Sequence, residues 1–170
     1  TLDSSSTFTG AVSFASAGTL ANVTINDSGA FELAALTLSG NLNVTAGGAV
    51  TQSGALVIPG TTTISASGQA VTLNTSTNNF TGAVAITGAN VSVVDAGALV
   101  LGASTVSGTF AATATASGDI TNTGALAITG AATFTAAGGQ SITVANASNN
   151  FASTVAFNSG GTLVNVSVLD

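Results

Sequence analysis

Short triplets in which a polar residue stands between two apolar residues recur along the whole chain. They are Val23-Thr24-Ile25, Leu36-Thr37-Leu38, Leu42-Asn43-Val44, Val71-Thr72-Leu73, Val91-Ser92-Val93, Ile142-Thr143-Val144 and Val166-Ser167-Val168. Because side chains alternate between the two faces of a strand, each triplet predicts a strand of about three to five residues with one face buried. Clusters of Gly, Asn, Ser and Thr, such as Thr75–Asn79 and Ala145–Asn150, predict turns between the strands.

The chain also repeats itself with a period of about 71 residues, and such long-period similarity is typical of solenoids. Phe8, Phe80 and Phe151 open three copies of the repeat. A motif of the form Asn-Val-x-apolar-x-Asp recurs at Asn22–Asp27, Asn90–Asp95 and Asn165–Asp170. Because the similarity spans nearly the whole chain, we expect stacked coils that bury one continuous apolar column.

The spacing of the apolar positions sets the expected size of a coil. About nine apolar centres lie between Val71 and Ile142, which predicts three coils of three short strands per repeat, about 24 residues per coil and about seven coils in all. Strand twist and the crossover rule favour a right-handed coil. We therefore predict an all-β fold, a single-stranded parallel β-helix in which residues 1–170 form one continuous segment of about 2.3 repeats. The chain begins with Thr rather than Met, so we expect it to be a fragment of a larger protein.

The composition excludes several kinds of partner. The 170 residues include no Lys, Arg, His, Cys, Met, Trp or Tyr, and six Asp and Glu residues give a net charge of -6. A chain without cations cannot neutralise phosphates, so we expect no nucleic-acid partner. Without Cys and His the common metal and haem sites lack ligands, so we expect no cofactor and no metal. Unbroken runs of Ala, Val, Leu, Ile and Phe reach only four residues, whereas a spanning helix needs roughly 20, so we expect no membrane insertion.

The carboxylates are the remaining candidates for chemistry. They are Asp3, Asp27, Glu32, Asp95, Asp119 and Asp170. If three whole coils separated the repeat-equivalent residues Asp27, Asp95 and Asp170, neighbours in this set would lie about 14 Å apart. That separation exceeds the roughly 5 to 9.5 Å of glycosidase pairs, and no cation is present to bind an anionic substrate. We therefore assign no catalytic residue and expect no enzyme; a carbohydrate-binding or lyase β-helix that uses Asp27 and Glu32 is the weaker alternative.

Asparagine is the other polar residue at repeated positions. The candidates are Asn78, Asn149, Asn22, Asn90 and Asn165. Their amides could stack from coil to coil as ladders, like those of cross-β structures. Asparagine is also a common turn residue because it tolerates left-handed backbone conformations, and this second interpretation is favoured.

Three further features carry a resemblance to a known family. They are Gly-Ala-Leu-x-Ile at residues 54–58 and 124–128, Gly-Asp-Ile-Thr-Asn-Thr-Gly at residues 118–124, and the Asn-Asn-Phe turns at residues 78–80 and 149–151. With the scarcity of charge, they make the chain resemble the repeat region of filamentous-haemagglutinin-like large exoproteins, which are bacterial adhesins of the two-partner-secretion or autotransporter type. The resemblance implies a long right-handed β-helix, a secreted or outer-membrane-associated location, and a role in adhesion, aggregation or biofilm.

Two functional hypotheses follow. The first is a structural stalk within a secreted or cell-surface adhesin, whose partners are neighbouring repeats of the same chain and a host or cell-surface glycan or protein. The second is a subunit of an extracellular filament or matrix that stacks end to end. Both hypotheses rest on the unpaired strand edges that a solenoid exposes at its two ends.

Overall fold

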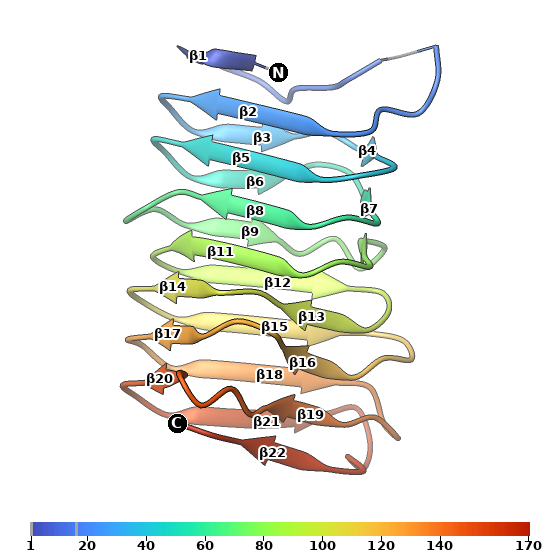
Figure 1. Ribbon diagram of the computed structural model, residues 1–170, viewed down its shortest axis with the longest axis vertical. Helices are drawn as coiled ribbons and strands as arrows, with labels where there is room; N and C mark the ends of the chain where they lie inside the picture. Colours follow the sequence, from blue (N-terminus) through green and yellow to red (C-terminus); the bar gives the residue numbers. More distant parts are fainter. Residues whose placement is uncertain (1, 16) are drawn as a thin grey trace.

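The computed structural model describes residues 2–15 and 17–170, and this part of the chain contains 22 strands and no helix. The strands wind into one elongated parallel β-helix of about seven turns, with the two chain ends at opposite ends of the rod (Figure 1). In consequence no helix in the described residues is long and apolar enough to cross a membrane. The predicted fold class, with three strands per coil, is confirmed.

In each turn the chain passes three sides of the rod in the same order. The first side holds β1 (Leu2–Ser6), β2 (Val23–Asp27), β5 (Leu42–Ala46), β8 (Thr62–Ser65), β11 (Val84–Gly88), β14 (Ser104–Val106), β17 (Leu126–Ile128) and β20 (Asn150–Phe151). The second side holds β3 (Phe31–Leu33), β6 (Val50–Gln52), β9 (Val71–Leu73), β12 (Val91–Asp95), β15 (Phe110–Ala114), β18 (Ala132–Ala136) and β21 (Val155–Ser159). The third side holds β4 (Leu36–Thr37), β7 (Leu56–Ile58) and β10 (Asn79–Phe80). After β12, β13 (Leu99–Leu101), β16 (Ile120–Asn122), β19 (Ile142–Val144) and β22 (Val166–Val168) follow the second-side strands and continue the large sheet of the first side (Figure 1).

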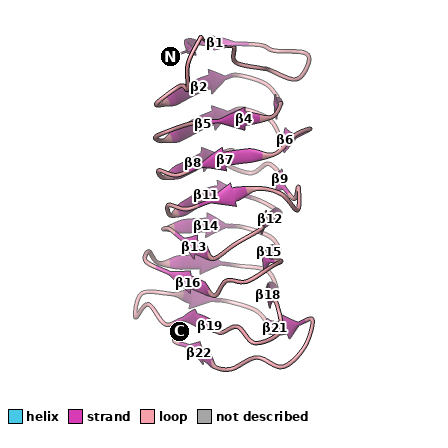
Figure 2. Cartoon of the chain, turned by 90° about the vertical axis from the view of Figure 1, so that its right-hand side faces the viewer, coloured by secondary structure: helices cyan, strands magenta, loops and turns pink. Residues whose placement is uncertain are grey.

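The coil is right-handed, as predicted from strand twist. In Figure 1 the first-side strands β2, β5 and β8 run to the left across the front, and the second-side strands return to the right behind them as the chain descends from its N-terminus. Figure 2 agrees, because it places β5 and β8 on one edge of the rod and β9, β12 and β15 on the other.

Strand pairing is continuous on the second side and shifts once in the large sheet of the first side. β11 is the strand where the shift occurs: Val84 pairs with Leu101 of β13, whereas Gly88 pairs with Val106 of β14. From this point the large sheet continues along two lines, β13, β16, β19 and β22 on one and β14, β17 and β20 on the other, while β4, β7 and β10 form a separate three-stranded sheet. The number of residues between paired positions therefore varies, from 17 between Val84 and Leu101 at the shift to 24 between Ile142 and Val166.

The core follows from the alternation seen in the triplets. Most strands alternate between buried and more exposed residues, so one face of each strand is buried. Because the strands are stacked in register, Ile25, Val44, Ile64 and Ile86 form one buried apolar column through four coils. The buried residues of the described chain form one continuous cluster, so each coil is stabilised by the coils above and below it.

The repeat does not contain a whole number of coils. Ten strands, β9 to β18, lie between the starts of the repeat-equivalent strands β9 and β19, whereas the sequence predicted nine. Ten strands at three per coil make three and one third coils, so the expectation of three coils per repeat is wrong. The strand that sequence patterning missed is β10 (Asn79–Phe80), because its two residues offer one inward side chain and no alternation.

Tight stacking also explains the glycines at one corner. Gly82 lies against the backbone of Gly60 in the coil before, and a Cβ atom on Gly82 would collide with the Gly60 carbonyl group. Gly68 and Gly139 have a different role, because each has a positive φ, of 74° and 82°, that other residues rarely adopt. These two residues are repeat-equivalent and form the same turn in both copies.

Candidate functional site

Buried polar side chains are concentrated where the chain turns from one side of the rod to the next. In the described residues they are Asp27, Thr62, Asn78, Asp95, Ser104 and Asn149. A buried polar group costs stability unless it is hydrogen-bonded. All but Thr62, whose hydroxyl has no partner in the described structure, bond to backbone groups. The polar core therefore completes the backbone hydrogen bonding of the coils.

Asp95 connects two neighbouring coils. Its Oδ2 atom accepts the backbone N–H of Phe80 in the coil before at 2.9 Å, and its Oδ1 atom accepts the N–H of Gly97 at 2.8 Å. Asp27 makes the equivalent contacts with the N–H groups of Phe8, at 3.1 Å, and Gly29, at 2.7 Å.

The C-terminal Asp170 accepts the N–H of Phe151 at 2.8 Å. In all three copies, the Asp that ends the repeated motif thus binds the Phe that opens the copy. This contact sets the register between successive coils in every copy of the repeat.

The three equivalent aspartates do not lie on one line along the rod. Asp27 ends β2 and Asp170 follows β22, both in the 12-stranded sheet, whereas Asp95 ends β12 in the seven-stranded sheet. The expected stacking of these residues about 14 Å apart, three coils from one another on one line, is therefore wrong. The physical reason is the extra strand in each repeat, which advances equivalent residues by one third of a turn.

The carboxyl group of Asp95 is fully buried and faces no cation, because the chain has none. Burial raises its pKa above the usual value of 3.8, and the N–H groups of Gly97, Phe80 and Ala96 oppose this effect only in part. In the unfolded chain the pKa returns to 3.8, so above that pH the folded chain holds its proton more strongly than the unfolded chain does. We therefore expect the free energy of unfolding to fall as pH rises through the raised pKa of Asp95.

This prediction is checked by urea unfolding at a series of pH values for the wild type and for Asp95→Asn, which cannot titrate. The variant should show a smaller decrease between acidic and neutral pH. Asp119→Asn, which removes one exposed carboxylate, is measured in the same series as the matched control for the loss of a negative charge. Equal slopes for the wild type and Asp95→Asn would contradict the prediction.

Asn78 is fully buried at the end of a turn and binds three coils together. Its Oδ1 atom accepts the N–H of Leu56 at 2.9 Å and an amide N–H of Gln52 at 2.8 Å. Its Nδ2 group donates to the carbonyl oxygens of Leu73 and Val94, each at 3.2 Å, and to Gln52 Oε1 at 2.9 Å. The side chain of Asn78 therefore forms hydrogen bonds with backbone groups that have no backbone partner at this turn.

Asn149 repeats this arrangement. Its Oδ1 atom accepts the N–H of Leu126 at 3.0 Å and an amide N–H of Asn122 at 2.9 Å, and its Nδ2 group donates to Val144 O and Leu169 O. The amide partner is Gln52 in the first repeat and Asn122 in the second. Asn78 and Asn149 thus belong to amide pairs with side chains 26 and 27 residues away, and they do not stack on each other.

The other three predicted asparagines are exposed at corners. Asn22 Oδ1 accepts the N–H of Asn41 in the next coil at 2.8 Å, and Asn90 Oδ1 accepts the N–H of Thr109 at 3.0 Å. Asn41 continues the contact by accepting the N–H of Thr61 at 2.8 Å. Asn165 holds the same position before β22, where its backbone carbonyl accepts the N–H of Ile142. These corner contacts run from side chain to backbone between successive coils.

Ser104 is a buried polar residue that sequence reasoning missed. Its hydroxyl accepts the N–H of Ile86 at 3.0 Å and donates to Gly102 O at 3.1 Å. Ile86 lies in the middle of β11, between the segments that pair with β13 and β14. The hydroxyl of Ser104 therefore satisfies the amide that the shift in pairing leaves without a carbonyl. The sequence did offer a signal for its burial, because Ser104 is a single Ser at a position where neighbouring triplets carry an apolar residue.

The remaining carboxylates do not form a cluster. Glu32 lies on β3, on the face opposite the buried Phe31 and Leu33. Asp119 Oδ1 accepts the N–H of Ser141 at 2.7 Å, and the side chain of Asp3 lies outside the described part. No group of three metal-binding side chains occurs within the described residues. Because both oxygens of Asp27 bind backbone N–H groups, its pairing with Glu32 in a catalytic site finds no support.

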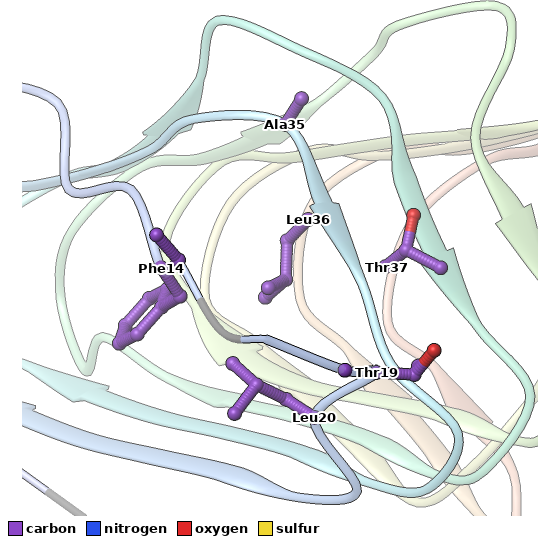
Figure 3. Close-up of a pocket in the computed structure, with 8 residues that line it drawn as sticks. Phe14, Thr19, Leu20, Ala35, Leu36 and Thr37 are labelled. Carbon is purple, nitrogen blue, oxygen red and sulfur yellow. The ribbon is translucent and has the colours of Figure 1, made fainter.

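Two open hollows lie at the N-terminal end of the rod. One, of about 340 Å³, is bordered by Phe14, Leu20 and Leu36 (Figure 3). The other, of about 420 Å³, is bordered by Phe8, Phe31 and Glu32. Both lie against the first complete coil, and Glu32 is the acidic residue at the rim of the second hollow.

The three-sided coil and the repeated Asp and Asn contacts define a repeat protein of the β-solenoid class. Residues 20–87 and 88–158 match the family model described as "Repeats of unknown function (DUF5649)", and the chain belongs to this family. The two matches correspond to β2–β11 and β12–β21, ten strands each. No curated protein and no solved structure matches the chain.

Proposed function

We propose that this chain is a structural stalk segment of a secreted or cell-surface bacterial adhesin that acts in adhesion, aggregation or biofilm. The observation that carries the proposal is the unbroken apolar column through about seven stacked coils. Each added coil lengthens such a rod by one strand spacing, about 4.8 Å, without changing its cross-section. A family built from these repeats can therefore set a distance between a surface and a binding region.

The chemistry of the side chains supports the same role. Asp27, Asp95, Asn78 and Asn149 are buried and bind backbone groups of neighbouring coils, so their polar atoms stabilise the rod. The resemblance to haemagglutinin-like repeats supplies the location and the adhesive context. The net charge of -6 keeps such rods soluble and opposes their side-by-side association.

The proposal is tested in cells that display the parent protein. Residues 20–158 are replaced in one strain by a flexible Gly-Ser linker of equal residue number and in another by an unrelated rigid β-helix of equal length. We expect the flexible linker to reduce adhesion or aggregation, because a coil of that composition spans a much shorter mean distance than a rod. The rigid replacement should restore it.

Two results would contradict the stalk. If the unrelated β-helix fails to restore adhesion while the protein is still displayed, the surface of this segment is itself the binding region. If a surface label reaches the segment only after the cells are lysed, the segment lies inside the cell and the proposed location is wrong.

A further inference from the structure

Eight Asn-x-Ser/Thr sequons occur in the chain, and this tripeptide is the acceptor motif for N-linked sugars on surface loops of secreted proteins. Two of them, which begin at Asn74 and Asn146, lie in turns. In the other six the middle residue belongs to a strand, where the backbone is extended and paired with a neighbouring coil. These six begin at Asn22, Asn26, Asn43, Asn79, Asn90 and Asn165.

The two turns occupy the same place in the two copies of the repeat. Residues 74–78 connect β9 to β10, and residues 145–149 connect β19 to β20 (Figure 1). A backbone hydrogen bond of 3.1 Å closes each turn, donated by the N–H of Asn78 in the first and of Asn149 in the second. Both asparagines are buried, so they anchor the turn in the core. Each repeat therefore presents one sequon on a turn of fixed shape.

At Asn146 the turn bends the sequon back on itself. Asn146 Oδ1 accepts the backbone N–H of Ser148 at 2.9 Å, which fixes the orientation of the amide. The Nδ2 group of Asn146 donates no hydrogen bond within the described residues. Asn146 is partly exposed, and the small side chains of Ala147 and Ser148 are exposed. The amide nitrogen and the hydroxyl of the motif are therefore both accessible on one side of the turn.

The sequons in strands do not have this arrangement. Val44, the middle residue of the Asn43 sequon, is fully buried in β5. Residues two apart in a strand are separated by about 6.6 Å, so the Asn and Thr of an extended sequon do not fold together. At Asn22 and Asn90 the amide oxygen also accepts a backbone N–H of the next coil. An enzyme that bends such a sequon must pull a paired strand out of the rod.

From this geometry we propose that Asn146 and Asn74 are acceptors of N-linked sugar, one in each repeat. Asn74 and Ser76 are exposed in their turn, as Ser148 is in the second. The donor is a sugar activated by phosphate at its anomeric carbon. Nδ2 forms a bond to that carbon, the bond from the carbon to the phosphate oxygen breaks, and the phosphate leaves with the electron pair. Nδ2 transfers one proton to a base of the transferase.

The test uses the parent protein isolated from the cells that display it and measures peptide masses. The chain contains no Lys or Arg, so it is cut before its aspartates rather than with trypsin. Residues 119–169 then form one peptide with a turn sequon at Asn146 and a strand sequon at Asn165. We expect added sugar mass on this peptide, and fragmentation should locate it at Asn146. The peptide of residues 27–94 should carry sugar at Asn74.

Three variants and a control test the role of the turn sequon. Asn146→Gln displaces the accepting nitrogen, and Ser148→Ala removes the hydroxyl but keeps the amide, so each should abolish the sugar on peptide 119–169. Ser148→Thr keeps the hydroxyl and should retain the sugar. Asn165→Gln removes the strand sequon of the same peptide and is the matched control, which should leave the sugar in place. Circular dichroism checks that all four chains are folded.

Two sources supply a sugar on phosphate, and they are distinguished with the unmodified 170-residue chain. Incubation with the soluble fraction of the native cells and a labelled nucleoside diphosphate sugar tests the first source. Incubation with washed membranes of these cells, which hold sugars on lipid pyrophosphate, tests the second. Sugar on peptide 119–169 after either incubation supports the proposal and identifies the donor.

Two results would overturn the proposal. One is that peptides from the displayed protein carry no sugar at either turn. The other is sugar at Asn165 or another strand sequon in place of Asn146, because the bent turn would then not select the acceptor. The stalk is not a premise of this inference. If both turns are unmodified and the unrelated rigid β-helix still restores adhesion, the sugar sites are wrong and the stalk stands.

Discussion

Replacing Asn78 with Ala should lower the free energy of unfolding by about 3 kcal/mol or more, because buried groups left without partners each cost about 1 to 3 kcal/mol. The side chain is fully buried, and its loss leaves the N–H of Leu56 and the carbonyl oxygens of Leu73 and Val94 without these hydrogen bonds. Urea unfolding measures the total effect. Hydrogen exchange locates it, since the amide of Leu56 should lose protection first.

Two variants make this prediction specific. Asn79→Ala removes the neighbouring amide, which is exposed, and should change stability by less than about 0.5 kcal/mol. Asn78→Asp keeps the shape but replaces the donating Nδ2 group with an oxygen that faces Leu73 O and Val94 O, so it should not restore stability. If Asn78→Ala and Asn79→Ala are equally mild, the amide of Asn78 does not hold the coils together.

The inward and outward faces of the strands could be predicted from the sequence. In Val23-Thr24-Ile25 and Ile142-Thr143-Val144 the outer residues of the triplet are buried and the central Thr is exposed. Local alternation is sufficient here, because the interior of the rod is apolar along its whole length. The 71-residue period then requires these strands to stack in parallel.

The phase of the repeat could not be predicted in the same way. It depends on β10, where Phe80 is the only inward residue, and on the shift in pairing at β11, where Val84 pairs with one strand and Gly88 with another. Both features are set by how one coil lies on the next. A pattern read along one strand carries no information about that relation, so an error of one strand per repeat followed.

Some of the buried polar residues could be predicted from the sequence and others could not. The sequence marked Asn78 and Asn149 by their repeated position, and both are buried. Their partners Gln52 and Asn122 are 26 and 27 residues away in the preceding coil and carry no local signal. The sequence assigned Asp95 no catalytic role, and its full burial could not be predicted. The residue type alone does not show that backbone N–H groups surround the carboxyl group of Asp95.

The one-third-turn advance has a consequence for the surface of the rod. The five-residue strands β2 and β5 of the first repeat lie on the first side, and their equivalents β12 and β15 of the second repeat lie on the second side. Equivalent surfaces of these two repeats therefore face different directions.

The second large effect is expected at Phe134. This side chain is fully buried in β18 and contacts three other rings, with centroid distances of 5.8 Å to Phe110, 6.1 Å to Phe151 and 5.8 Å to Phe157. Phe134→Ala removes all three contacts and leaves a cavity, so we expect it to lower the free energy of unfolding by about 3 to 5 kcal/mol. Urea unfolding checks this value.

Phe157 supplies the comparison, because it stacks on Phe134 but is only partly buried in the last coil. Phe157→Ala should therefore cost clearly less than Phe134→Ala. Phe134→Ile introduces the residue that Ile64 provides at the equivalent place in the first repeat, and it should fall between the wild type and Phe134→Ala. If Phe134→Ala and Phe157→Ala cost the same, coils at the middle and at the end of the rod contribute equally to stability. In that case the dependence of each coil on the coils above and below it would be wrong.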